Sequence, residues 1–418
     1  MLEPAPVAKP SAFARLLLPA GVDAAVLPLL LGRALRAFAD GYVAVLLPAY
    51  LLGLGFGQLD VGLLSTATLG GSALATLAVG ALGHRWPPRR LLLGAALLMA
   101  ATGWGFAGLS SFWPLLLVAF VGTLNPSSGD VSVFLPLEHA RLANAASGNA
   151  RTVLFARYSL TGSMSAAVGA LAAAIPPWLT AQAGLPLLVG LRMMFVLYGL
   201  IGGTVWLLYR NLAAEDTPTA QPPAPLGPSR GIVFRLAALF SVDAFAGGLV
   251  VNSLLSLWLF ERFGLSLTQA GVFFFWAGLL SAGSQLAAPV VARKIGLLNT
   301  MVFTHIPANI CLILAALAPN LGVALALLFI RSALSQMDVP TRTAFVMAVV
   351  TPAERAAAAS FTAVPRSLAS AASPTLAGAL LAAGFLSAPL VACGALKIAY
   401  DLALLVSFRR LNVPLDRE

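Results

Sequence analysis

The chain is built from long apolar runs, each about as long as a membrane-crossing helix. A helix needs about 20 predominantly apolar residues to cross the roughly 30 Å hydrocarbon core of a bilayer. Hydrophobic residues make up 59% of the chain and charged residues only 10%, whereas soluble domains carry about 25% charged residues. The sequence therefore predicts an all-α membrane protein. Its twelve expected transmembrane helices are 32–55, 61–82, 91–109, 112–136, 152–174, 190–209, 233–259, 269–292, 297–317, 321–345, 357–383 and 386–408.

The second half of the chain repeats the first. An offset of 209 residues relates Arg85 to Lys294, and both lie in short basic connections between apolar runs. Other pairs at or near this offset are Gly62 and Gly271, Asp130 and Asp338, Arg157 and Arg366, and Gly169 and Gly378. We therefore expect two pseudo-symmetric bundles of six helices each.

A polar, proline-rich segment separates the two repeats. Residues 211–231 hold several prolines and few apolar side chains, so they cannot bury a hydrophobic face and are typical of an exposed linker. The predicted organisation is an N-terminal bundle with its tail at 1–210, a linker at 211–231 and a C-terminal bundle at 232–418.

Basic side chains are concentrated in alternate connections between the runs. They include Lys9 and Arg15 in the tail, and Arg141, Arg151, Arg210, Arg230, Arg293, Arg355 and Arg409 further along. Because connections rich in Lys and Arg stay on the cytoplasmic side, we expect both termini and the linker to be cytoplasmic. This distribution also accounts for much of the net charge of +10 without a nucleic-acid partner.

One basic connection carries a family motif. The segment from Gly80 to Arg90 matches the pattern Gly-x-Leu-x-Asp-Arg-x-Gly-Arg-Arg at Gly80, Leu82, Arg85 and Arg89, with His84 in place of the acid. The second repeat keeps Lys294 and Gly296. With twelve spans and a central linker, the chain resembles the major facilitator superfamily over nearly its whole length. The resemblance implies two six-helix bundles, a functional monomer, and a central cavity lined by the first, fourth, seventh and tenth helices.

Polar residues inside the first and seventh spans are candidates for proton coupling or substrate binding. Arg36 and Asp40 lie four residues apart in the first span, hence on one helical face, and Asp243 and Asn252 lie in the seventh. Ionisable groups at bilayer depth are costly and tend to be functional. Each aspartate is either the neutralised partner of a nearby arginine or a carboxylate that exchanges a proton, and Asp40 is the favoured proton site.

The fourth and tenth spans contain polar breaks. Asn125, Ser128 and Asp130 interrupt the fourth span, and Gln336 and Asp338 interrupt the tenth. Such breaks point to binding sites near the midplane of transporters. The two aspartates are expected either to contact substrate or, as favoured here, to form a cytoplasmic gate that opens and closes with the bundles. The basic partners considered for that gate are Arg85, Arg89, Arg157, Lys294 and Arg366.

Other intramembrane polar groups have simpler expected roles. Lys397 and Asp401 are spaced as an i, i+4 ion pair in the last span, and His305 and Asn309 are expected to form hydrogen bonds between helices. Arg331 is the deepest basic residue of the tenth span and is a candidate counter-charge for an anionic solute.

These patterns favour a secondary transporter over an enzyme. No phosphate-binding loop of the Gly-x-x-x-x-Gly-Lys-Ser/Thr type is present, and the cysteines and histidines lack metal-ligand spacing, so we expect neither cofactor, metal nor catalytic residue. The leading expectation is proton-coupled export of a drug-like or amphipathic compound through the inner membrane of a bacterium. The alternatives are uptake or facilitated diffusion of a small organic anion and, from another class, a membrane-embedded sensor or lipid-modifying enzyme.

Overall fold

The computed structural model describes residues 18–19, 22–82, 85–127, 132–213, 226–351 and 354–409, and all statements below concern these residues. They form helices and connecting segments without a strand. The helices are η1 (Ala24–Val26), α2 (Leu27–Gly53), α3 (Gln58–Leu82), α4 (Pro88–Gly108), α5 (Phe112–Val121), α6 (Phe134–Ala145), α7 (Gly148–Leu171), η3 (Ala172–Ala174), α8 (Ile175–Ala183), α9 (Leu187–Tyr209), α10 (Arg230–Gly248), α11 (Asn252–Phe263), α12 (Leu267–Ile295), α13 (Leu297–Ala316), α14 (Leu321–Leu334), α15 (Asp338–Val349), α16 (Arg355–Ala372), α17 (Pro374–Ala382) and α18 (Ala388–Phe408).

Ten helical segments in the described ranges are long and apolar enough to cross a membrane. The fourth and eleventh expected spans occur as pairs of shorter helices instead, α5 with α6 and α16 with α17. The expected continuous helix 112–136 is therefore wrong in its extent. α5 ends before Gly122, and Asn125 and Pro126 follow. Glycine disfavours helix because it loses much backbone entropy there, and Pro126 disfavours the helical conformation of Asn125, the residue before it.

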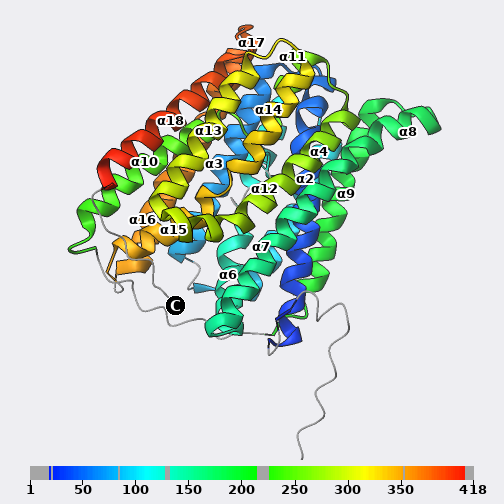
Figure 1. The fold of residues 1–418 in the computed structure, drawn as a ribbon. Helices are drawn as coiled ribbons and strands as arrows, with labels where there is room; N and C mark the ends of the chain where they lie inside the picture. The colour runs from blue at the N-terminus through cyan, green and yellow to red at the C-terminus, as the bar shows by residue number, and fades with distance from the viewer. Residues whose placement is uncertain are drawn as a thin grey trace, which may run out of the picture.

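The packing repeats between the halves, as the duplicated sequence predicts. In the first half α2 packs against α7, and α4 packs against α9. In the second half the equivalent helices form the same pairs, α10 with α16 and α13 with α18. The axes of the long helices lie roughly along one common direction, and the short helix α8 projects from the upper end of the molecule (Figure 1).

The two ends of the bundle are named here by the helices that begin and end there. The terminal face holds the start of α2, the end of α9, the start of α10 and the end of α18. The opposite face holds the short connections after α2 and α11. The predicted 211–231 linker joins the end of α9 to the start of α10, both at the terminal face, and its residues 214–225 fall outside the described residues. The domain boundaries and the cytoplasmic location of this face remain predictions.

Small residues join the two halves near the opposite face. A Cβ atom added to Gly62 of α3 would lie 2.6 Å from the carbonyl oxygen of Pro374, and one added to Gly378 of α17 would lie 2.7 Å from that of Gln58. Gly271 of α12 is equally close to the backbone of Ala170 in α7. The absence of a side chain at these positions lets the backbones approach, which is how helices associate without a hydrophobic driving force.

Hydrogen bonds cross between the halves in the same region. Thr375 donates to the Thr66 hydroxyl at 2.8 Å, and the hydroxyls of Ser65 and Ser253 lie 3.3 Å apart. At the two broken helices, the backbone N–H of Ser253 donates to the Pro126 carbonyl at 3.0 Å. We call this set of contacts, together with the glycine contacts above, the seam.

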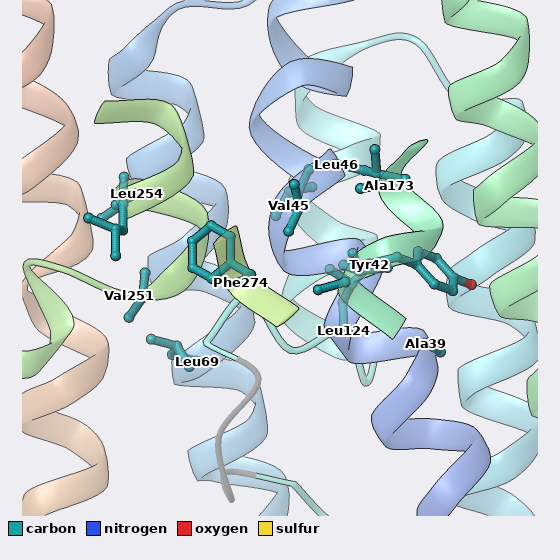
Figure 2. Packing of buried hydrophobic residues seen from close by; sticks show 14 of the residues in the cluster. Ala39, Tyr42, Val45, Leu46, Leu69, Leu124, Ala173, Val251, Leu254 and Phe274 are labelled. Carbon is teal, nitrogen blue, oxygen red and sulfur yellow. The ribbon is translucent and has the colours of Figure 1, made fainter. Parts of the chain in front are cut away.

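Buried apolar side chains from both halves pack beside the seam. Figure 2 shows Phe274 of α12 and Leu254 of α11 near Leu69 of α3 and Val45 of α2, all in one buried cluster. Val45 is fully buried and Leu254 is 2% exposed. This packing excludes water between the halves on the opposite-face side of the molecule.

Candidate functional site

A buried ion pair occupies the interior of the first half. Arg36 of α2 donates to a carboxylate oxygen of Glu138 in α6 at 2.7 Å and to the Tyr209 hydroxyl at 2.6 Å. Glu138 also accepts hydrogen bonds from the hydroxyls of Tyr158 in α7 and Tyr209 in α9. The guanidinium lies over the ring of Phe134 at 4.0 Å. We call these five residues the Arg36 cluster.

The Arg36 cluster links four helices of one half. Glu138 is fully buried and Arg36 is 5% exposed. A buried charge is tolerated when paired and when its remaining donors and acceptors are satisfied. The hydroxyls of Tyr158 and Tyr209 provide the additional hydrogen bonds to Glu138 and Arg36. The cluster therefore fixes α2, α6, α7 and α9 relative to one another.

A second buried network occupies the second half. Asp243 of α10 accepts from Lys397 of α18 at 2.5 Å and from Arg342 of α15 at 3.0 Å. Arg342 also lies 3.4 Å from Asp338, one turn before it in the same helix. These four residues, here the Asp243 cluster, are all at most 9% exposed. Asp243 lies 13 residues after the start of α10, or about 20 Å along the helix axis at 1.5 Å per residue.

The two clusters have opposite polarity. In the first half the first span supplies the cation, Arg36, and the broken fourth span supplies the anion, Glu138. In the second half the seventh span supplies the anion, Asp243, and the broken tenth span supplies the cation, Arg342. In each half an ion pair therefore joins the first and fourth spans, with the charges exchanged between the halves.

The predicted coupling and binding residues fall in different surroundings. Asp40 is partly buried in α2, within electrostatic range of Arg33 and Arg36. Asn252 begins α11 beside the seam, Asn125 lies in the break after α5, and Gln336 accepts a hydrogen bond from Gln285 of α12 at 3.4 Å. Ser128 lies outside the described residues. The described candidates thus come from both halves.

Among the predicted gate residues, Asp338, Arg89 and Arg366 have a partner or charged neighbour within their own half. Asp338 pairs with Arg342 of its own helix, and Arg89 donates to the backbone carbonyl of Arg210 in its own half. Arg85 and Lys294 are exposed at the terminal face, Arg157 is partly exposed, and Arg366 is exposed within electrostatic range of Asp338 and Asp243. Asp130 lies outside the described residues. A gate between the halves remains a prediction.

The ion-pair and hydrogen-bond partners of Lys397, Asp401 and Asn309 differ from those predicted from the sequence. Lys397 and Asp401, spaced to pair with each other, each bind another helix: Lys397 binds Asp243, and Asp401 binds His305 of α13 at 2.9 Å. The His305 contact joins two helices as expected, whereas Asn309 donates to the His305 carbonyl within α13. Glu138 and Arg342 were not singled out from the sequence, although each is an ionisable residue inside or beside an apolar run.

A third carboxylate lies between α15 and α16, outside the spans. Glu354 accepts hydrogen bonds from the hydroxyls of Ser229 and Thr351, each at 2.6 Å, and from the backbone N–H of Gly227. These hydrogen bonds, which favour the ionised form, lower the pKa of Glu354 from 4.5 to about 2. The contact ties the start of α10 to the connection between the tenth and eleventh spans.

Removal of Glu138 should leave Arg36 as an uncompensated buried charge. We expect Glu138→Gln to lower the free energy of unfolding by about 3–5 kcal/mol, measured by denaturant titration in detergent micelles. The double variant Arg36→Met/Glu138→Leu should regain much of this loss because no charge then remains buried. The exposed Glu261→Gln is the matched control. A Glu138→Gln protein as stable as this control would contradict the assignment.

The depressed pKa of Glu354 predicts a defined pH window. A carboxylate with a lower pKa in the folded state stabilises the fold above its unfolded pKa, here about 4.5. The stability difference between wild type and Glu354→Gln should therefore be constant above about pH 5 and shrink as the pH falls from 4.5 toward 2. Thermal unfolding of both proteins across this range measures the difference. A difference that is independent of pH would show that Glu354 is not held in this way.

Comparison with known proteins places this architecture in a family. The family profile of the Major Facilitator Superfamily matches residues 29–374. An uncharacterized membrane protein of Saccharomyces cerevisiae is 24% identical over 92% of this chain and 94% of its own length.

Solved structures with the same fold include transporters of several solutes. The nucleoside transporter NupG has a TM-score of 0.70 at 15% identity and covers 93% of this chain and 100% of its own. An auto-inhibited POT family peptide transporter has a TM-score of 0.71 at 12% identity, with coverages of 95% and 99%. The human organic anion transporter MFSD10 has a TM-score of 0.65 at 18% identity, with coverages of 91% and 98%. At these identities the likeness concerns the fold. With two duplicated helical halves and a profile match over most of its length, this multi-pass membrane protein belongs to the Major Facilitator Superfamily.

Proposed function

We propose that the chain is a proton-coupled secondary transporter that moves a small solute by alternating access. The observation that carries this proposal is the difference between the contacts that join the two halves and the contacts within each half. The halves touch through bare backbone, short hydroxyl side chains and apolar packing near the opposite face. The strongest ion pairs, in contrast, lie within each half. Each half can then move as a body while its own charges stay neutralised.

The seam is suited to opening and closing. Its hydrogen bonds join neutral hydroxyl and backbone groups. The halves also meet where Gln58 donates to the exposed Glu261 carboxylate at 3.3 Å, a group that water can solvate when the halves part. Rigid-body motion of packed domains about an interface is a common way to switch between two states. The arrangement supports a state that is closed at the opposite face and reached from the terminal face.

Asp40 is the proposed site of proton coupling. It lies on the same face of α2 as Arg36, whose terminal nitrogens bind Glu138 and Tyr209. A partly buried carboxylate near two arginines can change its protonation when access changes from one face to the other. Export of an amphipathic compound and movement of a small organic anion both fit this mechanism. A single chain carries both halves, which supports a functional monomer.

Proton flux in proteoliposomes tests the proposal. Purified protein would be reconstituted with a pH-sensitive dye inside, and pooled cationic, neutral and anionic solutes would be added under an imposed proton gradient. We expect the wild type to show solute-dependent proton movement and Asp40→Asn to lose it, because the amide cannot titrate.

The matched control is Asp23→Asn, since Asp23 is exposed and caps η1 through the Ala25 N–H at 3.0 Å, a role that asparagine also fills. Solute movement without protons in the wild type would leave a uniporter. Binding of a solute that is never moved would favour a membrane-embedded sensor over a transporter.

A further inference from the structure

Arg331 is a cation inside the second half without a carboxylate partner. It lies in α14, ten residues after the start of that helix. In the part of the chain that the structure describes, its Nε is buried and has no hydrogen-bond partner. The titratable group within electrostatic range of its guanidinium is the Cys393 thiol of α18, which is fully buried.

The buried carboxylates of the second half that the structure describes are already engaged. Asp243 binds Lys397 and Arg342, and Asp401 binds His305. Asp338 lies beside Arg342, two helical turns beyond Arg331 toward the terminal face. The buried cations Arg36, Arg342 and Lys397 thus have carboxylate partners, whereas no carboxylate among the described residues pairs with Arg331.

An unpaired guanidinium at this depth is costly. A charged side chain near the centre of a spanning helix disfavours insertion, and an uncompensated buried charge weakens a fold further. Guanidinium also presents a planar fork of N–H donors that matches the oxygens of carboxylates and phosphates. A small anion that enters the bundle would neutralise the charge of Arg331 and accept hydrogen bonds from its guanidinium.

Cys393 is a shared neighbour of Arg331 and the Asp243 cluster. The thiol lies within electrostatic range of Arg331, Lys397 and Asp243. Cys393 is fully buried in α18, about one helical turn before Lys397. The guanidinium of Arg331 and the Lys397–Asp243 pair thus act on the same buried thiol in the second half.

We propose that Arg331 is the anion-binding group of the transport pathway and that the transported solute carries a carboxylate, sulfonate or phosphate. The inference rests on the transport function proposed above and names its substrate class. It assigns to Arg331 a ligand-binding role, in contrast to the structural role of the paired Arg36 and Arg342.

Thermal unfolding in detergent tests the site directly. The probes are benzoate, benzenesulfonate and inorganic phosphate, compared at equal ionic strength with neutral benzamide. We expect at least one anion to stabilise the wild type and Arg331→Lys, and to have no effect on Arg331→Gln. Charge-assisted hydrogen bonds contribute about 1.5–3 kcal/mol, so the apparent affinity of Arg331→Gln for that anion should fall roughly 10- to 100-fold. The control is Arg262→Gln, which changes an exposed arginine in the last turn of α11.

The stability of the free protein separates binding from structure. Arg331→Met should unfold at the same or a higher temperature than wild type, because it removes a charge inside the bundle that no described carboxylate neutralises. A structural arginine would make this variant less stable. The proposal is overturned if Arg331→Met is destabilised, if Arg331→Gln keeps the anion effect, or if none of the three anions stabilises the wild type.

Flux measurements keep this proposal distinct from the transport proposal. Exchange of the stabilising anion across proteoliposomes should be lost in Arg331→Gln and retained in Arg262→Gln. Movement of neutral or cationic solutes by wild type and Arg331→Gln alike would overturn the anion site and leave transport intact. Stabilisation by an anion through Arg331 without movement of any solute would support the site and count against transport.

Discussion

A charge inside the hydrocarbon core must be neutralised by a group within reach of its own side chain, and this constraint organises the interior of both halves. Arg36 reaches Glu138 and two tyrosines, and Asp243 reaches Lys397 and Arg342. Each network spans several helices of one half, so it holds that half together as a unit. Because each of these two networks is neutralised within its own half, motion of one half against the other need not break it.

The contacts between the halves follow a different rule. Glycines at 62, 271 and 378 let backbones approach closely, and the seam also contains hydrogen bonds of serine and threonine hydroxyls and of the backbone. Packing of small residues gives close contact without strong directional bonds. The molecule therefore combines halves that are tied internally by ion pairs with a boundary of close packing and neutral hydrogen bonds, as the proposed movement of the halves requires.

Much of the fold could be predicted from the sequence because its determinants are local. Runs of apolar residues specify spans, and the 209-residue offset of pairs such as Arg85 and Lys294 specifies the duplication. The polar stretch around Asn125 and Pro126 indicated a break, although the extent of that break and the division of the eleventh span at Ser373 required the structure. Local helix preference does not determine where a broken helix resumes.

The ion-pair partners could not be predicted in the same way. Arg36 and Glu138 are 102 residues apart, and their meeting depends on the rotation of two helices about their own axes. The spacing of Lys397 and Asp401 favours a pair within one helix, yet stronger partners on α10 and α13 take both side chains. The absence of any partner for Arg331 among the described residues is likewise visible only when all neighbouring helices are in place.

The most direct test of the account is to lock the seam. In a variant with Cys311 and Cys393 replaced by alanine, Ser65→Cys and Ser253→Cys would place two thiols where the hydroxyls now lie 3.3 Å apart. Oxidation should abolish solute flux, and reduction should restore it. The control pair, Thr102→Cys with Thr123→Cys, joins two segments of one half and should leave flux unchanged. Undiminished flux through the protein cross-linked at the seam would contradict alternating access by movement of the two halves.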